Sequence, residues 1–121
     1  MRMGPMIAAL FVVLSSEALA EESAEFRPMD GNMITQTLTG QVLDYDGAWQ
    51  DFRASGKTLY NAGHDSWGNW SVRGDQYCSQ WPPNDLWACY DMQMRVTAHG
   101  VTELRFIDAF DSEIIGRLRR E

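Results

Sequence analysis

The chain is poor in the residues that mark nucleic-acid, redox and zinc proteins. Of its 121 residues, one is a lysine, Lys57, two are histidines and two are cysteines. The formal net charge is −7, so the chain offers no basic surface for a phosphate backbone, which excludes nucleic-acid binding. The two cysteines do not form a C-x-x-C pair, and no further ligands complete a zinc set with them.

Motifs for catalysis are also missing. The sequence contains no serine elbow, no glycine-rich phosphate loop and no paired catalytic carboxylates. His64-Asp65-Ser66 has the residue types of a hydrolase triad, but neighbours in one short turn cannot align as base, orienter and nucleophile. His64 and His99 both fall in predicted turns, and they would share a metal only if those turns lay at the same end of the fold. We therefore expect no catalytic residues, no metal and no cofactor.

The single long apolar run lies at the N-terminus, from Met6 to Leu14. One charged residue, Arg2, precedes this run, and the small-residue pattern Ala18-Leu19-Ala20 follows it, as in a secretory signal peptide. The run is too short to span a bilayer stably. The sequence thus predicts a signal peptide over residues 1–20, a mature chain of 101 residues with no stable membrane insertion, and a periplasmic or secreted location.

Residues 21–29 are polar and acidic, which predicts a flexible lead-in, and residues 30–121 form one predicted domain. The domain opens with a short helix over residues 30–38. Asp30 or Asn32 is its expected cap, and its apolar side carries Met33, Ile34 and Leu38.

From Thr39 onward, β-branched and aromatic residues alternate with polar ones, and seven turn signals recur. The turns are Asp46-Gly47, Ser55-Gly56, Gly63 to Asp65, Gly74-Asp75, Pro82 to Asp85, His99-Gly100 and Phe110 to Ser112. They predict an all-β fold, an antiparallel meander of about eight strands. Closure removes exposed strand edges, so we expect a small up-and-down barrel of the lipocalin type, with a two-sheet sandwich as the alternative.

The register of one hairpin brings the two cysteines together. A two-residue turn at Gly74-Asp75 and a four-residue turn at Pro82 to Asp85 place Cys78 opposite Cys89, at a separation that suits a disulfide. An oxidising compartment, which the signal peptide implies, would allow this bond to form. The same register presents six side chains to the core, Trp70, Trp81, Leu86, Ala88, Tyr90 and Met92, and leaves Trp87 beside the disulfide on the outer face.

The five tryptophans lie within 39 residues and are joined by several tyrosines. An eight-stranded barrel is just wide enough for side chains to fill, so we expect these rings mainly to fill it. The alternatives are an aromatic-lined cavity for one apolar ligand, or an exposed aromatic anchor for a partner. Trp67 and Trp87, which the register points outward, are the candidate anchors.

Two resemblances add to this interpretation. Leu38-Thr39-Gly40, the stretch from Ser66 to Cys78 and the second cysteine at 89 resemble a group of small secreted bacterial proteins of unknown function, with the motif G-x-W-x-V-x-G-D-x-x-C. This resemblance implies a secreted β domain and transfers no catalytic residues. The chain is also similar to the periplasmic inhibitors of C-type lysozyme, in which a Ser-Gly loop with a basic residue enters the enzyme cleft. Here that loop would be Ser55, Gly56 and Lys57.

The sequence therefore favours a secreted or periplasmic β-barrel that acts by binding and not as an enzyme. Its expected partner is an unidentified small ligand or an envelope protein, which would meet the Trp67 and Trp87 surface or the barrel mouth. The alternative is an inhibitor of a cell-wall hydrolase that acts through the turn from Ser55 to Lys57.

Overall fold

The computed structural model describes residues 24–120. The predicted signal peptide lies outside the described residues. Two elements lead into the barrel, the short strand β1 (Arg27–Pro28) and the helix α2 (Gly31–Leu38). Eight strands follow, and they are β2 (Gln41–Tyr45), β3 (Ala48–Phe52), β4 (Lys57–Asn61), β5 (Asp65–Arg73), β6 (Gln76–Gln80), β7 (Trp87–Val96), β8 (Thr102–Ile107) and β9 (Glu113–Leu118).

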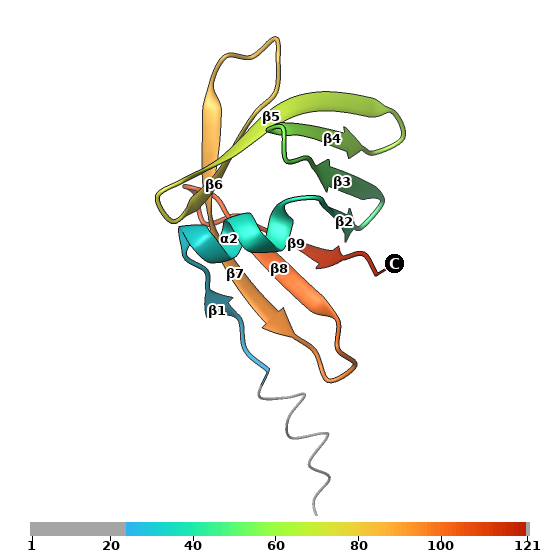
Figure 1. Cartoon of the computed structure of the whole chain (residues 1–121), viewed down its shortest axis with the longest axis vertical. Helices are drawn as coiled ribbons and strands as arrows, with labels where there is room; N and C mark the ends of the chain where they lie inside the picture. The colour runs from blue at the N-terminus through green and yellow to red at the C-terminus, as the bar shows by residue number, and fades with distance from the viewer. Residues whose placement is uncertain (1–23, 121) are drawn as a thin grey trace, which may run out of the picture.

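Strands β2 to β9 pair antiparallel in chain order, and β9 pairs with β2 to close an eight-stranded barrel (Figure 1). The all-β meander is thus confirmed, and closure decides between the barrel and the sandwich. All seven predicted turns connect consecutive strands. Because neighbouring strands run in opposite directions, successive turns lie alternately at the two ends of the barrel.

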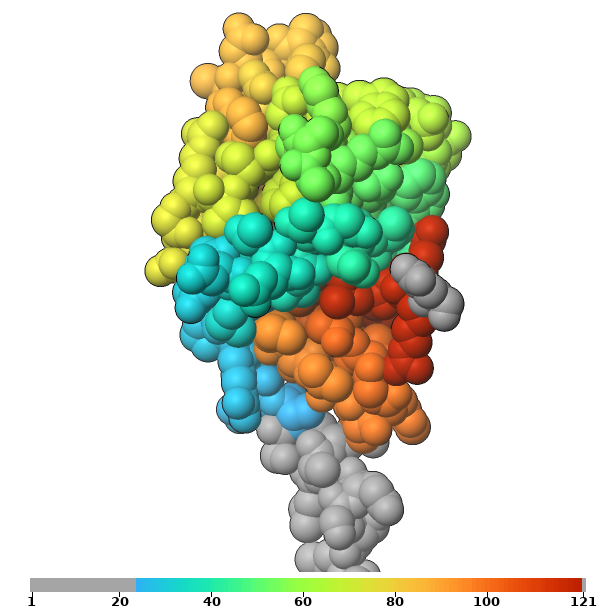
Figure 2. Space-filling view, viewed as in Figure 1, coloured from blue at the N-terminus to red at the C-terminus, as the bar shows by residue number. Residues whose placement is uncertain are grey.

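Helix α2 covers one of these ends. Asp30 caps the helix by accepting a hydrogen bond from the Met33 N–H, and the Gly31 N–H donates to Asp75 in the β5–β6 turn. A Cβ on Gly31 would lie 2.2 Å from the Gly74 carbonyl oxygen, so only glycine permits this close docking. In Figures 1 and 2 the helix lies in front of the strands, at mid-height of the view.

The apolar core lies between α2 and the barrel interior. Ile34 and Leu38, one helical turn apart, are fully buried against Leu43, Phe52 and Leu104. Met33, which we expected on the same apolar side, is exposed instead. The helix is only eight residues long and rests one narrow stripe on the barrel, and Met33 lies beside that stripe. No helix within residues 24–120 is long and apolar enough to cross a membrane.

The segment expected as a flexible lead-in is packed in its described part. Arg27 and Pro28 pair with the part of β7 that extends beyond the first residue of β6, and Met29 is buried in the core. The Phe26 ring contacts two guanidinium groups, those of Arg95 and Arg105. The chain is therefore fixed to the outer wall before α2 begins.

The cysteine hairpin has the predicted register. Cys78 of β6 lies opposite Cys89 of β7, and the two are joined by a disulfide. Two of the predicted core positions are wrong: Leu86 is 76% exposed and Ala88 is exposed. The pairing ends at Gln80 and Trp87, so Leu86 belongs to a loop, and β8 pairs with β7 only from Asp91 onward, which leaves Ala88 uncovered.

Candidate functional site: a cavity at the open end of the barrel

The end of the barrel opposite α2 contains a cavity of about 1110 Å³. Its walls come from the residues where β2, β4 and β6 end, and from the starts of β5 and β9. The aromatic lining residues are Tyr45, Tyr60, Trp67, Tyr77, Trp81, Tyr90 and Phe106. Aromatic rings thus fill the half of the barrel under α2, whereas the other half is hollow.

The lining rings support one another around the wall. The Tyr60 ring lies 6.1 Å from that of Trp81 and 6.2 Å from that of Tyr45, measured between centroids. Phe106 continues the series, at 6.3 Å from Tyr45 and 5.3 Å from Tyr77. Edge-to-face and tilted pairs at these distances are favourable, so the rings form a preorganised wall that does not need to collapse inward.

A network of neutral polar groups forms the floor of the cavity. The buried Gln50 accepts a hydrogen bond from the Tyr45 hydroxyl through Oε1, at 2.9 Å. Its Nε2 donates to the Thr58 hydroxyl at 3.0 Å and to the Tyr77 hydroxyl at 3.1 Å. Thr58 donates onward to the Asp51 carbonyl. All four polar groups of the network therefore have partners despite their burial.

Burial keeps the floor uncharged. Desolvation raises the pKa of Tyr77 to about 12, although hydrogen bonds from Ser79 and Gln50 favour its ionised form. Desolvation also raises the pKa of Tyr45 well above its ordinary value, and the neighbouring tyrosines add to this effect. The charged side chains that line the cavity lie near its rim, at Asp46, Glu113 and Arg117.

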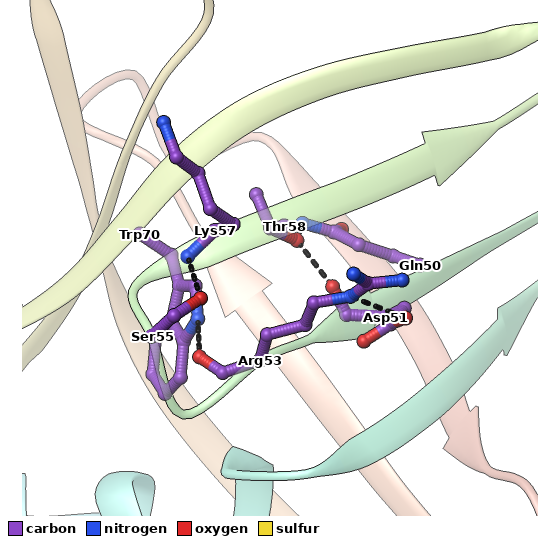
Figure 3. Close-up of polar contacts among 7 residues, drawn as sticks. All are labelled: Gln50, Asp51, Arg53, Ser55, Lys57, Thr58 and Trp70. Carbon is purple, nitrogen blue, oxygen red and sulfur yellow. Dashed lines mark hydrogen bonds and ion pairs between the residues drawn. The ribbon is translucent and has the colours of Figure 1, made fainter.

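The turn from Ser55 to Lys57 lies at the other end of the barrel, next to α2. Figure 3 shows the turn folded over the Trp70 ring, whose Nε1 donates to the Arg53 carbonyl at 2.9 Å. The Ser55 hydroxyl accepts a bond from the Lys57 N–H, and the Lys57 ammonium donates to Asn69. The turn and the barrel mouth are thus separate surfaces and cannot meet one small ligand together.

The two candidate anchors, Trp67 and Trp87, are each stacked by an arginine, and Trp67, near the start of β5, also borders the cavity. The Arg53 guanidinium lies 4.7 Å from the Trp67 ring, and the Arg73 guanidinium lies 4.1 Å from the Trp87 ring. Trp67 remains 48% exposed, whereas Trp87 is partly covered beside the disulfide. They stand on different strands, and a cation–π contact already occupies one face of each ring.

The histidines do not converge. His64 lies in the β4–β5 turn at the mouth, and His99 lies in the β7–β8 turn at the helix-covered end. The structure thus separates the two residues of the hypothetical metal pair. Within residues 24–120, no three acidic, histidine or cysteine side chains stand close enough together to hold a metal ion.

The sequence interpretation did not identify Gln50 or Tyr45 as site residues. The signal that identifies Gln50 is its place in the alternating strand AWQDF, where it shares the inward side with the buried Phe52. A polar residue at an inward position needs a partner inside the fold, and here that partner is the floor of a cavity.

Comparison with protein-family models, curated proteins and solved structures finds no match for this chain.

Proposed function

We propose that the protein binds a small molecule in the barrel cavity and acts by carrying or sensing it, without catalysis. The observation that supports this function best is the cavity itself, about 1110 Å³ with aromatic walls and a polar floor. Small-molecule sites are typically concave, mostly apolar and about 300–1,000 Å³ in volume, with few polar groups that fix orientation. The cavity is large enough to hold a whole small ligand.

The chemistry of the lining supports binding over reaction. Away from the charged side chains of the rim, the polar groups of the lining are phenols, an indole N–H, an amide and hydroxyls, which orient a ligand by hydrogen bonds. The Ser79 hydroxyl accepts a bond from the Trp81 indole at 3.2 Å. Among the described lining residues, no histidine, lysine or cysteine stands beside Ser79 to activate it as a nucleophile.

A periplasmic or secreted location is part of this proposal. Two features support it, the signal-peptide pattern of residues 1–20 and the Cys78–Cys89 disulfide, since such bonds persist in oxidising compartments. The ligand would then be a molecule of the envelope or of the surroundings.

Inhibition of a cell-wall hydrolase is the alternative proposal, and the contacts of its turn do not favour it. The side chains of Ser55 and Lys57 already form hydrogen bonds within their end of the barrel. The Ser55 hydroxyl accepts from the Lys57 N–H, and the Lys57 ammonium donates to Asn69. Under the ligand-binding proposal, the wild-type protein and the Lys57→Ala variant leave C-type lysozyme equally active. Inhibition by the wild type that Lys57→Ala abolishes would support the alternative instead.

The binding proposal is tested with N-phenyl-1-naphthylamine, an uncharged dye that fluoresces in apolar cavities. We expect a saturable fluorescence increase at one dye per protein. Ser66, which pairs with Tyr60 and lines the mouth, is the position to block, because Ser66→Phe places a ring in the opening. Ser55→Phe makes the same change at the other end and is the matched control.

The dye response should be lost in Ser66→Phe and kept in Ser55→Phe. No saturable response in the wild type, or an equal loss in both variants, would contradict the proposal. Loss in Ser55→Phe alone would move the binding surface to the turn at the helix-covered end.

A further inference from the structure

Two strand glycines hold two aromatic rings against opposite walls of the cavity. A Cβ built on Gly68 in β5 would lie 2.5 Å and 2.7 Å from two atoms of the Trp81 ring. A Cβ built on Gly116 in β9 would lie 2.8 Å from the Tyr45 ring. Each ring occupies the space of a missing side chain on the neighbouring strand, and so lies along the wall and not across the lumen.

The two rings face each other across the barrel. Trp81 lies over the boundary between β5 and β6, and Tyr45 lies over the boundary between β9 and β2. In the closed order of eight strands, these boundaries are half a circuit apart. Both rings stand about 6 Å from that of Tyr60, at 6.1 and 6.2 Å between centroids, so they are no more than about 12 Å apart.

Hydrogen bonds fix the orientation of both rings. The Trp81 indole N–H donates to the Ser79 hydroxyl at 3.2 Å, and the Tyr45 hydroxyl donates to Gln50 at 2.9 Å. Both acceptors are buried, so neither ring turns into the lumen without losing a buried bond. The ring surface is thus preorganised, which lowers the entropic cost of binding to it.

The rings of Trp81, Tyr60 and Tyr45 form one continuous aromatic wall of the cavity. Favourable aromatic pairs have centroids about 4.5–7 Å apart, so a planar aromatic ligand in the lumen can pack on these rings as they pack on one another. The floor beneath the rings carries only neutral groups, and the carboxylates that line the cavity, Asp46 and Glu113, lie at strand ends. The wall therefore favours an uncharged ring over an organic cation.

From this geometry we infer that the cavity selects a planar, uncharged aromatic ligand, which stacks on the wall formed by Trp81, Tyr60 and Tyr45. This inference rests on the proposed binding function and names the ligand class for the same cavity. The floor hydroxyls, Tyr77 above all, provide hydrogen-bonding groups for a polar substituent at the inner edge of the ligand.

The test compares three competitors for displacement of bound N-phenyl-1-naphthylamine. They are 2-naphthol, its saturated and non-planar counterpart decahydro-2-naphthol, and the cation benzyltrimethylammonium. Each aromatic contact is worth a few-fold in affinity, so we expect 2-naphthol to displace the dye at about tenfold lower concentration than decahydro-2-naphthol. The cation should be weaker than 2-naphthol.

Variants locate the effect. Trp81→Leu should reduce the preference for 2-naphthol over decahydro-2-naphthol, because an aliphatic side chain replaces one aromatic contact. Trp87→Leu on the outer wall should leave this preference unchanged. Gly116→Ala should also reduce it, because its Cβ displaces the Tyr45 ring from the wall; the nearest atoms are side-chain atoms, which can move.

The outcomes separate this inference from the proposed function. Equal displacement by 2-naphthol and decahydro-2-naphthol would overturn stacking on the aromatic wall and leave a general apolar cavity. Stronger displacement by benzyltrimethylammonium would replace it with a cation site. A dye that never binds the wild type would overturn the proposed function itself. The competitor comparison needs only the wild-type protein, so it stands even where a variant fails to fold.

Discussion

Loss of the Cys78–Cys89 disulfide should cost the protein a large part of its stability. The cysteines are eleven positions apart, so the bond closes a loop of about twelve residues across the β6–β7 hairpin. In the chain-entropy treatment, such a loop stabilises the folded state by about 3 kcal/mol. Domains of this size are stable by only about 5–15 kcal/mol in total.

The assay is thermal unfolding of the wild type with and without reductant. One kcal/mol corresponds to about 4–8 °C for a domain of up to about 100 residues, so reduction should lower Tm by about 12–24 °C. Reduction removes no side-chain atoms, and the result therefore contains no cavity cost. Cys78→Ala/Cys89→Ala is the control, because its Tm should not respond to reductant.

A decrease of only a few degrees on reduction would refute this reasoning. It would mean that the pairing of β6 with β7, together with the stacking of Arg73 on Trp87 beside the bond, already fixes the hairpin in the reduced protein. A Tm of the double variant that still fell with reductant would show that reductant acts elsewhere.

Two further predictions concern the floor of the cavity and the N-terminal segment. Because burial raises the pKa of Tyr77 to about 12, and that of Tyr45 well above its ordinary value, stability should be complete below pH 10 and be lost as the pH rises from there towards 12. Near-ultraviolet absorbance should show these two tyrosines ionising together with the loss of circular dichroism, and complete ionisation of all four tyrosines in a folded barrel would contradict this. Phe26→Ala should lower the free energy of unfolding, measured in urea, by about 1–2 kcal/mol, since it removes contacts with two guanidinium groups. Phe110→Ala, at a position 88% exposed, should not, and equal effects of the two variants would show that these contacts do not stabilise the fold.

Local sequence features were sufficient to predict most of the fold. The turns at Gly74-Asp75 and Pro82 to Asp85 set a register in which Cys78 faces Cys89, and side-chain alternation with period two then assigned the faces of both strands. The exposure of Leu86 could not be predicted from turns and alternation alone. Where a ladder stops depends on how the neighbouring strands diverge, and that is decided by the whole barrel.

The cavity was harder to predict because it depends on contacts between distant strands. Gly116 and Tyr45 are far apart in the sequence. Gly116 leaves space for the Tyr45 ring only because β9 pairs with β2 when the barrel closes. A glycine inside a strand pattern indicates a close approach, but it does not say of what. The register also pointed Trp67 and Trp87 outward, yet it carried no information about the arginines that cover them.

The central claim is that a ligand occupies the open end of the barrel, and tryptophan indole signals test it most directly. The measurement is a proton–nitrogen correlation spectrum of the labelled protein, titrated with N-phenyl-1-naphthylamine. Trp81 lies in the cavity wall with its N–H on Ser79, whereas Trp87 lies on the outer wall under Arg73. The account predicts that the Trp81 signal shifts with saturation while the Trp87 signal stays in place. A shift of Trp87 with an unmoved Trp81 would contradict it and place binding on the outer surface.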